Sequence, residues 1–204
     1  MPRYDPVSLW LARFRQRRKY DRWLRDGKPY PTAHLAKQGV IRDFARRHGS
    51  RVFIETGTHM GTMVEAVKRD FDAVYSIELA DPLYADAVRR FRKDPHVHIL
   101  HGDSGKVLPE LIRGLTRPAL FWLDGHYSGG VTACGDKETP ISEELNAVLA
   151  HPVPGHVILI DDARCFTGAA DYPELEALRR SVLEARPDHR FEVADDIIRI
   201  HKPV

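Results

Sequence analysis

The chain has 204 residues, of which 43% are hydrophobic and 29% charged, and its net charge is +2. This composition is typical of a soluble globular protein, and the length suits one domain with an extension. No apolar run approaches the roughly 20 residues that span a bilayer, and the N-terminus lacks the apolar segment and cleavage site of a signal peptide. Two cysteines are too few for a disulfide scaffold, so we expect a reducing, cytoplasmic location.

Positive charge is concentrated at the N-terminus, where residues 1–28 contain nine lysines and arginines against three acids. Trp10, Phe14, Tyr20 and Trp23 are interleaved with them, so the segment could be a basic amphipathic helix that binds an anionic membrane surface. The alternative, which we favour, is a helix whose aromatic face lies on the core or on a second subunit of a homodimer. The basic residues are not accompanied by a nucleic-acid-binding motif, so no nucleic-acid partner is predicted.

The remaining chain reads as regular elements in order. After the break at residues 27–31, apolar spacing predicts a helix that ends near His48–Gly49. From residue 51 onward, short apolar runs alternate with segments of helical periodicity. The predicted strands are 52–54, 73–77, 97–100, 119–123 and 157–160, and the helices that follow them are 60–69, 82–92, 105–113, 141–149 and 173–184. Residues 191–200 are two strand-like runs that predict a hairpin.

This alternation predicts an α/β fold with a doubly wound, mostly parallel, Rossmann-like sheet that is covered on both faces and has a C-terminal antiparallel strand. We assign residues 1–49 to an N-terminal helical extension and residues 50–204 to the domain. In such sheets ligands bind beyond the carboxyl ends of the strands, so the residues at those ends are the functional candidates.

The turn after the first strand is the most informative stretch. Glu55 closes the strand, and Gly57 and Gly61 bracket a turn before helical spacing resumes, in the pattern E-x-G-x-x-x-G. The dinucleotide-binding pattern G-x-G-x-x-G differs from it. Glycines let the backbone approach a ligand that a Cβ would meet. Glu55 would repel a pyrophosphate but attract an ammonium group such as that of S-adenosylmethionine. Taken alone, the stretch also fits an ordinary strand-to-helix turn.

Each of the five predicted strands is closed by an acid. A single acid after a strand is usually a helix cap or a loop residue, but five at one sheet edge are hard to explain by capping. Glu78 follows Gly57 by 21 residues and can hold the two hydroxyls of a ribose, while Asp103 and Ser104 could reach an adenine. The acids are Glu55, Glu78, Asp103, Asp124, and the pair Asp161 and Asp162.

The segments ETGTHMG, YSIE, HGDS, FWLDGHYSGG and LIDDAR occur in this order, and together they resemble the class I S-adenosylmethionine-dependent methyltransferases over residues 51–202. The resemblance implies a glycine turn that holds the methionine part of the cofactor, an acid that binds its ribose and another acid near its adenine. Carried over to this chain, the implied cofactor-binding residues are Glu55, Gly57, Thr58, Gly61, Glu78, Asp103, Ser104 and Asp124.

Within this class, the strand-end aspartates are similar to those of metal-dependent O-methyltransferases, including the macrocin and cephalosporin hydroxylase-like types. The resemblance implies that Asp124, Asp161 and Asp162 bind Mg²⁺, since converging carboxylates repel one another unless a cation neutralises them. Without a metal, Asp124 would be a cofactor contact and the other two would be loop and cap residues. His126 and Tyr127 stand where the sugar enzymes tend to have another acid, which leaves the substrate and the metal open.

The predicted activity is methyl transfer to a hydroxyl of a small polar molecule, for which a sugar is one candidate. Asp124 and His126 are the catalytic candidates, His126 as a general base, with a histidine at the surface, or one that contacts only other site residues, as the alternative interpretation of His126. Two alternatives remain. One is an NAD-linked or nucleotide-sugar oxidoreductase, which the glycine spacing and the lack of a Tyr-x-x-x-Lys motif disfavour. The other is a non-catalytic methyltransferase fold that serves as a binding module.

Overall fold

A computed structural model of the protein describes residues 6–124 and 139–204, with side chains from residue 14 onward. Its centre is a seven-stranded sheet in the order β3-β2-β1-β4-β5-β7-β6. Strands β1 to β5 are parallel, and β7 lies antiparallel between β5 and β6. The predicted fold class is confirmed. The strands are β1 (Val52–Thr56), β2 (Ala73–Glu78), β3 (Val97–His101), β4 (Leu120–Leu123), β5 (Val157–Ile160), β6 (Arg190–Ala194) and β7 (Ile197–His201).

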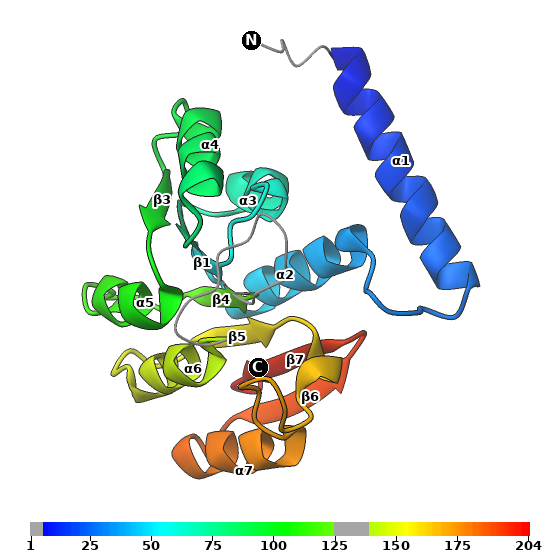
Figure 1. Cartoon of the computed structure of the whole chain (residues 1–204). Helices are drawn as coiled ribbons and strands as arrows, with labels where there is room; N and C mark the ends of the chain where they lie inside the picture. Colours follow the sequence, from blue (N-terminus) through cyan, green and yellow to red (C-terminus); the bar gives the residue numbers. More distant parts are fainter. Residues whose placement is uncertain (1–5, 125–138) are drawn as a thin grey trace.

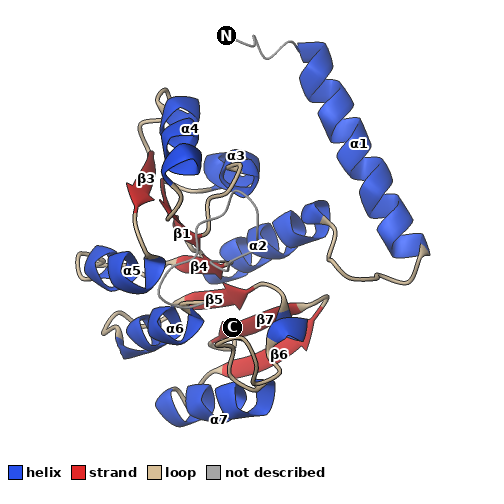
Figure 2. Ribbon diagram, in the orientation of Figure 1, coloured by secondary structure: helices blue, strands red, loops and turns tan. Residues whose placement is uncertain are grey.

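Helices cover both faces of the sheet (Figures 1 and 2). Helices α2 (His34–His48), α3 (Thr62–Val67) and α4 (Asp81–Phe91) lie on one face, and α5 (Ser104–Ile112), α6 (Ile141–Ala150) and α7 (Leu175–Ala185) on the other. Successive strand residues alternate between these layers, because side chains along a strand point to opposite sides. Phe121 belongs to the buried cluster that includes residues of α5, α6 and α7, whereas Trp122 belongs to the cluster that includes residues of α2, α3 and α4.

Helix α2 belongs to this core, although it precedes the first strand. Ile41 and Phe44 are completely or almost completely buried and pack against residues of β1, β4 and β5. Gly49 follows the last helical residue, His48, in a left-handed conformation with φ +62°, which is a common way for a helix to end. The helix therefore ends where the sequence predicts. The domain boundary at residue 49 stays a prediction.

Helix α1 (Pro6–Arg25) stands away from the sheet and is joined to α2 by an irregular segment (Figure 1). Trp23, near its end, is buried and donates a hydrogen bond from Nε1 to the Pro29 carbonyl oxygen over 2.8 Å. Phe14 and Leu24 remain exposed. No helix in the described ranges combines the length and apolarity needed to cross a bilayer.

The start of α3 differs from the prediction in an informative way. The pattern predicts one helix over 60–69, but the helix runs from Thr62 to Val67 and a 3₁₀ turn follows at Lys68–Asp70. Gly61 precedes the helix with φ +65°, a left-handed conformation that a helix interior does not contain. The glycine therefore sets where the helix begins.

Candidate functional site

The strand-end acids gather where the strand order reverses. From β1 the chain continues to β2 on one side, and after β3 it returns to β4 on the other side. Thr56 at the end of β1 pairs with Leu123 of β4, and the Asp124 amide donates to the Thr56 carbonyl oxygen over 3.2 Å. Such a reversal opens a crevice at the carboxyl edge of a doubly wound sheet, which is where these proteins bind ligands.

The glycine turn lies at this edge and is tied to the end of β2. Gly57 has φ +81°, and its amide and that of Thr58 both donate to the Ile77 carbonyl oxygen, over 3.0 and 3.2 Å. At Gly61 a Cβ would lie 2.9 Å from the ring of Phe91 in α4. Gly61 is therefore required by its own φ and by helix packing, and its predicted contact with a cofactor stays a prediction.

Glu78 braces the same turn. Its two carboxylate oxygens accept the backbone amides of His59, over 2.7 Å, and Ala80, over 2.9 Å. The side chain is buried at the end of β2, and the two amides hold its carboxylate in place. A carboxylate has about four acceptor sites, and these two bonds leave acceptor capacity for the hydroxyls of a ligand.

Glu55 is the second-last residue of β1 and lies in a chain of hydrogen bonds. The Ser76 hydroxyl donates to Glu55 Oε2 over 2.5 Å and lies 2.6 Å from the buried Thr58 hydroxyl. Burial raises the pKa of Glu55 to about 8, with the charges of Asp124 and Glu78 adding to the shift and the Ser76 bond opposing it. A protonated Glu55 carries no charge to attract an ammonium group, so a cationic ligand would have to favour its ionised form.

Asp103 and Ser104 begin α5. Asp103 is the N-cap and accepts the Gly105 amide over 3.0 Å, and Lys106 Nζ lies 3.3 Å from its carboxylate. The Ser104 hydroxyl is hydrogen-bonded to Glu144 of α6. Asp103 thus has the capping role that is usual after a strand, and contact of either residue with an adenine stays a prediction.

Glu144 is a buried acid that the sequence analysis missed. It is completely buried, and Thr56 Oγ1 donates to its Oε2 over 3.3 Å. Burial raises its pKa to about 7, against the hydrogen bonds from Ser104 and Thr56. Its sequence signal was an acid on the apolar side of the predicted helix, three residues after Ile141 and four before Val148.

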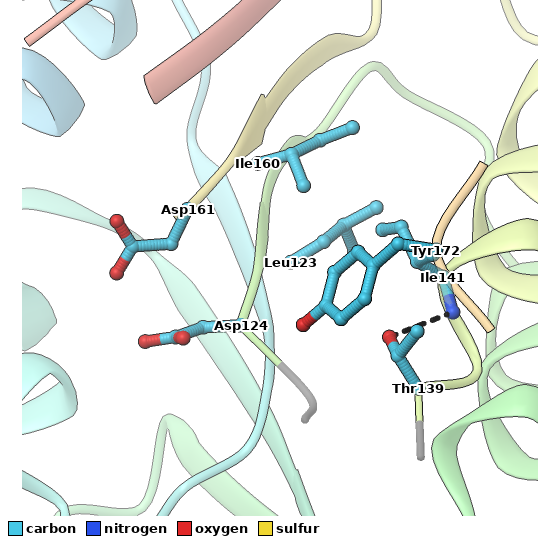
Figure 3. A pocket seen from close by; sticks show the side chains of 7 residues that line it. All are labelled: Leu123, Asp124, Thr139, Ile141, Ile160, Asp161 and Tyr172. Atoms are coloured by element: carbon cyan, nitrogen blue, oxygen red, sulfur yellow. Dashed lines mark hydrogen bonds between the residues drawn. The ribbon is translucent and has the colours of Figure 1, made fainter. Parts of the chain in front are cut away.

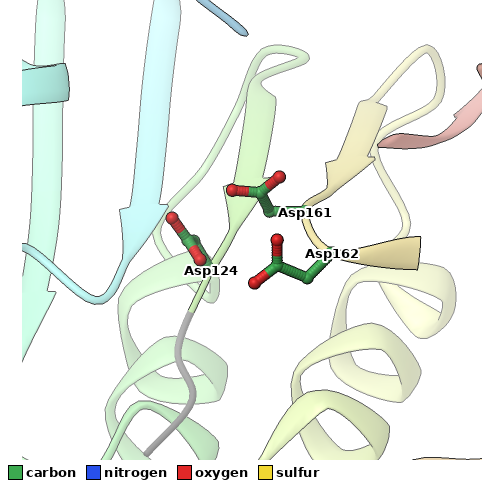
Figure 4. Close-up of side chains that lie close together, drawn as sticks. All are labelled: Asp124, Asp161 and Asp162. Carbon is green, nitrogen blue, oxygen red and sulfur yellow. The ribbon is translucent and has the colours of Figure 1, made fainter. Parts of the chain in front are cut away.

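Asp124, Asp161 and Asp162 form what we call the aspartate cluster. One carboxylate oxygen of each lies within 4.8 Å of the others (Figure 4). Asp124 follows β4 and the other two follow β5, so the pairing of these strands brings them together. Burial and then the charge of Asp124 raise the pKa of Asp161, whereas Lys37 lowers it. Lys37 therefore favours the ionised form of the Asp161 carboxylate.

Lys37 enters the aspartate cluster from α2, and sequence analysis did not single it out. Its Nζ donates to Asp161 Oδ2, and both side chains are largely buried. Burial alone would lower the pKa of Lys37, but Asp161 and Asp124 together raise it. The signal was its helical position: Lys37 precedes Ile41 by four residues and Phe44 by seven, so it lies on the buried stripe of α2.

His34 lies one turn before Lys37. Its Nδ1 is 2.8 Å from Gln38 Nε2, and its Nε2 is buried with no partner among the described residues. Burial, and next the charge of Lys37, lower the pKa of His34, with Asp124 opposing. This edge therefore contains an imidazole that favours its neutral form. The predicted base His126 lies outside the described residues.

Arg164 holds the other side of the aspartate cluster. Its Nη1 donates to Asp162 Oδ1 over 2.7 Å and also to Asp196 in the β6–β7 turn. Its amide donates to Asp196 Oδ1 over 2.9 Å. Asp162 itself has φ +54°, a conformation that aspartate tolerates better than most residues. The turn after β5 is thus fastened to the final hairpin.

A small pocket lies beside the aspartate cluster (Figure 3). Asp124 and Asp161 are on one side of it and Tyr172 and Thr139 on the other, with an apolar part between them. Burial raises the pKa of the Tyr172 hydroxyl, which therefore stays protonated near neutral pH. The lining residues are Leu123, Asp124, Thr139, Ile141, Ile160, Asp161 and Tyr172.

The residues of the aspartate cluster fit a divalent cation. They offer hard oxygen ligands, as Mg²⁺ prefers. Asp161 Oδ1 is buried and has no hydrogen-bond partner within the described ranges, which is unusual for a carboxylate oxygen with a side chain that is only 1% exposed. Lys37 contacts the other oxygen of Asp161, Oδ2, and Arg164 contacts Asp162 Oδ1, so two positive side chains of the protein already lie on the cluster.

Comparisons with known proteins identify the fold. No family model matches the sequence, and a search of curated proteins finds no similar sequence. Among solved structures, the O-methyltransferase TomG from Streptomyces achromogenes, in complex with S-adenosylmethionine, aligns over 92% of this chain and 89% of its own, with 18% identity and a TM-score of 0.60.

Two further structures agree with this result. An O-methyltransferase from Bacillus cereus in complex with S-adenosylhomocysteine aligns over 92% of this chain and 90% of its own, with 15% identity and a TM-score of 0.60. The Podospora anserina methyltransferase PaMTH1, bound to S-adenosylhomocysteine, aligns over 100% and 98%, with 15% identity and a TM-score of 0.61. The chain has the class I S-adenosylmethionine-dependent methyltransferase fold.

Proposed function

We propose that the chain is an S-adenosylmethionine-dependent methyltransferase that methylates a hydroxyl of a small polar acceptor with the assistance of a divalent cation. The observation that carries the methyltransferase assignment is Glu78. It is a buried carboxylate fixed at the end of β2 beside the Gly57 turn, at the point where the strand order reverses. An acid at this place suits the two hydroxyls of an adenosine ribose. The O-methyltransferase neighbours, solved with the methyl donor or its product, support the same reading.

Methyl transfer is an in-line displacement. The acceptor oxygen forms a bond to the methyl carbon while the carbon–sulfur bond breaks, and the sulfur leaves as a neutral thioether with the electron pair of that bond. The acceptor loses its hydroxyl proton to a base. The protein mainly has to hold the two reactants in line, because orientation can supply a large part of the rate enhancement.

The residues of this edge have separate roles in the proposal. Glu78 and the Gly57 turn bind the donor, and Glu55 lies under its methionine part. A divalent cation held by Asp124, Asp161 and Asp162 would lower the pKa of a bound hydroxyl. His126 remains the candidate base. The Tyr172 and Thr139 side of the pocket would face the acceptor, which supports a small polar molecule as its class.

The oxidoreductase alternative predicts a different ligand at the same acid, since NAD also has a ribose that a strand-end carboxylate can bind. The antiparallel β7 between β5 and β6, and the neighbours with the methyltransferase fold, disfavour it. A non-catalytic binding module would lack turnover but could retain the cofactor site.

The test is titration calorimetry with S-adenosylmethionine, S-adenosylhomocysteine and NAD, in the presence and absence of Mg²⁺. We expect the wild-type protein to bind the first two at micromolar concentration and Glu78→Ala to bind them at least tenfold more weakly. Glu192→Ala, an exposed acid of β6, is the matched control and should bind as the wild type does. Thermal unfolding of each variant separates lost binding from lost folding, because Glu78 also fixes two backbone amides.

Failure of the wild-type protein to bind either methyl compound, with or without Mg²⁺, would contradict the proposal. NAD binding that depends on Glu78 would favour the oxidoreductase. Binding of S-adenosylmethionine without transfer to any hydroxyl in an acceptor screen would favour the binding module.

A further inference from the structure

The aspartate cluster already contains a cation that belongs to the chain. We propose that Lys37 is an internal counterion which competes with a divalent cation for Asp161, so that the protein binds that cation only when the lysine is displaced. The inference rests on the divalent site of the proposed function and adds a residue, outside the aspartates, that controls its occupancy.

The contacts of Asp161 carry the argument. Its side chain is 1% exposed, and its two oxygens differ: Oδ2 accepts from Lys37 Nζ, whereas Oδ1 has no partner among the described residues. Lys37 is itself only 15% exposed, so water screens the pair poorly. The Asp161 carboxylate is therefore paired with one positive charge through Oδ2, while its buried Oδ1 keeps acceptor capacity for a ligand.

A divalent cation and the Lys37 ammonium cannot both remain on this carboxylate without a large cost. The ligand oxygens of the aspartate cluster lie within 4.8 Å of one another, and Lys37 Nζ donates to a carboxylate of this same cluster, so a cation among these oxygens would lie close to the ammonium. Like charges at this separation repel strongly where solvent is excluded. One of the two cations must therefore leave when the other binds.

The lysine is the partner that can move. Its ammonium is a point charge on a flexible four-carbon stem, and it is attached to the first turn of α2, which begins at His34. Extending the stem would bring the ammonium to solvent while the stem stays packed. Arg164 is held differently, because it is fixed between Asp162 and Asp196 and does not contact Asp161.

Competition makes a specific prediction about cation affinity. Removal of the Lys37 charge leaves Asp161 buried and unpaired, which destabilises the protein without metal and strengthens its attraction for a divalent ion. We therefore expect Lys37→Met to bind Mn²⁺, used as the probe, at least tenfold more tightly than the wild type. The same variant should gain more thermal stability from Mn²⁺ than the wild type does.

The experiment is a titration of the full chain with Mn²⁺. Binding is measured by calorimetry and, independently, by the electron paramagnetic resonance signal of free Mn²⁺. Lys37→Arg keeps the charge and should bind as weakly as the wild type. Lys202→Met removes an equal charge at the opposite edge of the sheet, where Lys202 pairs with Asp188 over 3.1 Å, and should also resemble the wild type. Asp161→Asn should abolish tight binding with or without Lys37. Lys37→Gln provides a second neutral variant if Lys37→Met does not fold.

Equal Mn²⁺ affinity of the neutral variants and the wild type would overturn the proposal, and so would a failure of all variants to bind Mn²⁺ at millimolar concentration. Neither result depends on the methyl donor. Titration of S-adenosylmethionine into the wild type and Glu78→Ala reports separately on the proposed methyltransferase site.

Discussion

Glu55 and Glu144 are both buried at the carboxyl edge of the sheet, and both have raised pKa values. Glu55 and Glu144 are held by hydroxyl groups, from Ser76 for the first and from Thr56 and Ser104 for the second. Burial raises the pKa of Glu55 to about 8 and that of Glu144 to about 7. Ionising either acid in the folded protein therefore costs free energy that ionisation in the unfolded chain does not.

Glu144 makes stability depend on pH. Its pKa is about 7 in the folded protein against 4.5 for the ordinary group, so the folded state binds the proton more tightly. Its stabilising contribution is complete below about pH 4.5 and is lost as pH rises through about 7. We expect wild-type stability to fall by on the order of 3 kcal/mol from this group over that range, and Glu144→Gln to lack this fall.

Denaturant unfolding of both proteins between pH 5 and pH 8 measures the difference. Glu55 and the other titrating groups contribute equally to wild type and variant, so the difference isolates Glu144. A gap between the two proteins that stays constant with pH would contradict the predicted shift.

At the scale of elements, the start of α3 depends on a single glycine. Gly61 has φ +65°, and a Cβ there would lie 2.9 Å from the Phe91 ring. Gly61→Ala would combine a left-handed conformation, which costs a non-glycine residue about 1 kcal/mol, with displacement of a buried ring. We expect a loss of stability of about 2–4 kcal/mol, measured by denaturant unfolding.

Gly39 offers the matched control within α2. It is exposed, and a Cβ there would meet nothing within 4 Å. Because glycine is a poor helix former, Gly39→Ala should raise stability by up to about 1 kcal/mol. Similar effects of the two substitutions would show that neither packing nor φ constrains Gly61.

Helix α2 shows how one element joins the core to the site. Ile41 and Phe44 anchor it on the sheet, and the same stripe carries Lys37 to Asp161. A lysine at a largely buried helical position is costly unless it is paired with an acid. The partner lies 124 residues further along the chain, and only the packing of α2 across β4 and β5 identifies it.

At the scale of the whole molecule, two apolar layers share one sheet. Neighbouring residues of β5 belong to different layers: Ile158 lies in the cluster with residues of α5, α6 and α7, and Leu159 lies in the cluster with residues of α2, α3 and α4. Both residues are buried on the same strand. Loss of either layer should therefore disrupt the hydrogen bonds of β5 with β4 and β7, on which the other layer also depends. The domain should therefore unfold as one unit.

We expect Ile158→Ala and Leu159→Ala each to cost about 2–5 kcal/mol and to shift one common transition. Far-ultraviolet circular dichroism and tryptophan fluorescence, recorded against denaturant, should give coincident curves for both variants. Val193→Ala, an exposed position of β6, is the control and should change stability little. A biphasic transition in either core variant would show that the layers unfold separately.

The sequence by itself determined most of the fold, because the elements are specified locally. Strand residues 157–160 have the predicted bounds, and β1 extends its predicted strand by two residues to Thr56. The antiparallel final strand and the line of acids at the strand ends also follow from the pattern. Alternating apolar runs, glycine turns and helix ends act over a few residues, so they can be read without the rest of the chain.

Only the tertiary structure decided which of those acids cap a helix, which hold backbone amides and which are paired with a positive charge. Asp103 caps α5, Glu78 holds two amides, and Asp161 meets Lys37. Glu144 and Lys37 each lie on a buried helical stripe whose partner is distant in sequence. Burial and long-range pairing set the pKa and the available lone pairs of a carboxylate, and both depend on how the helices pack on the sheet.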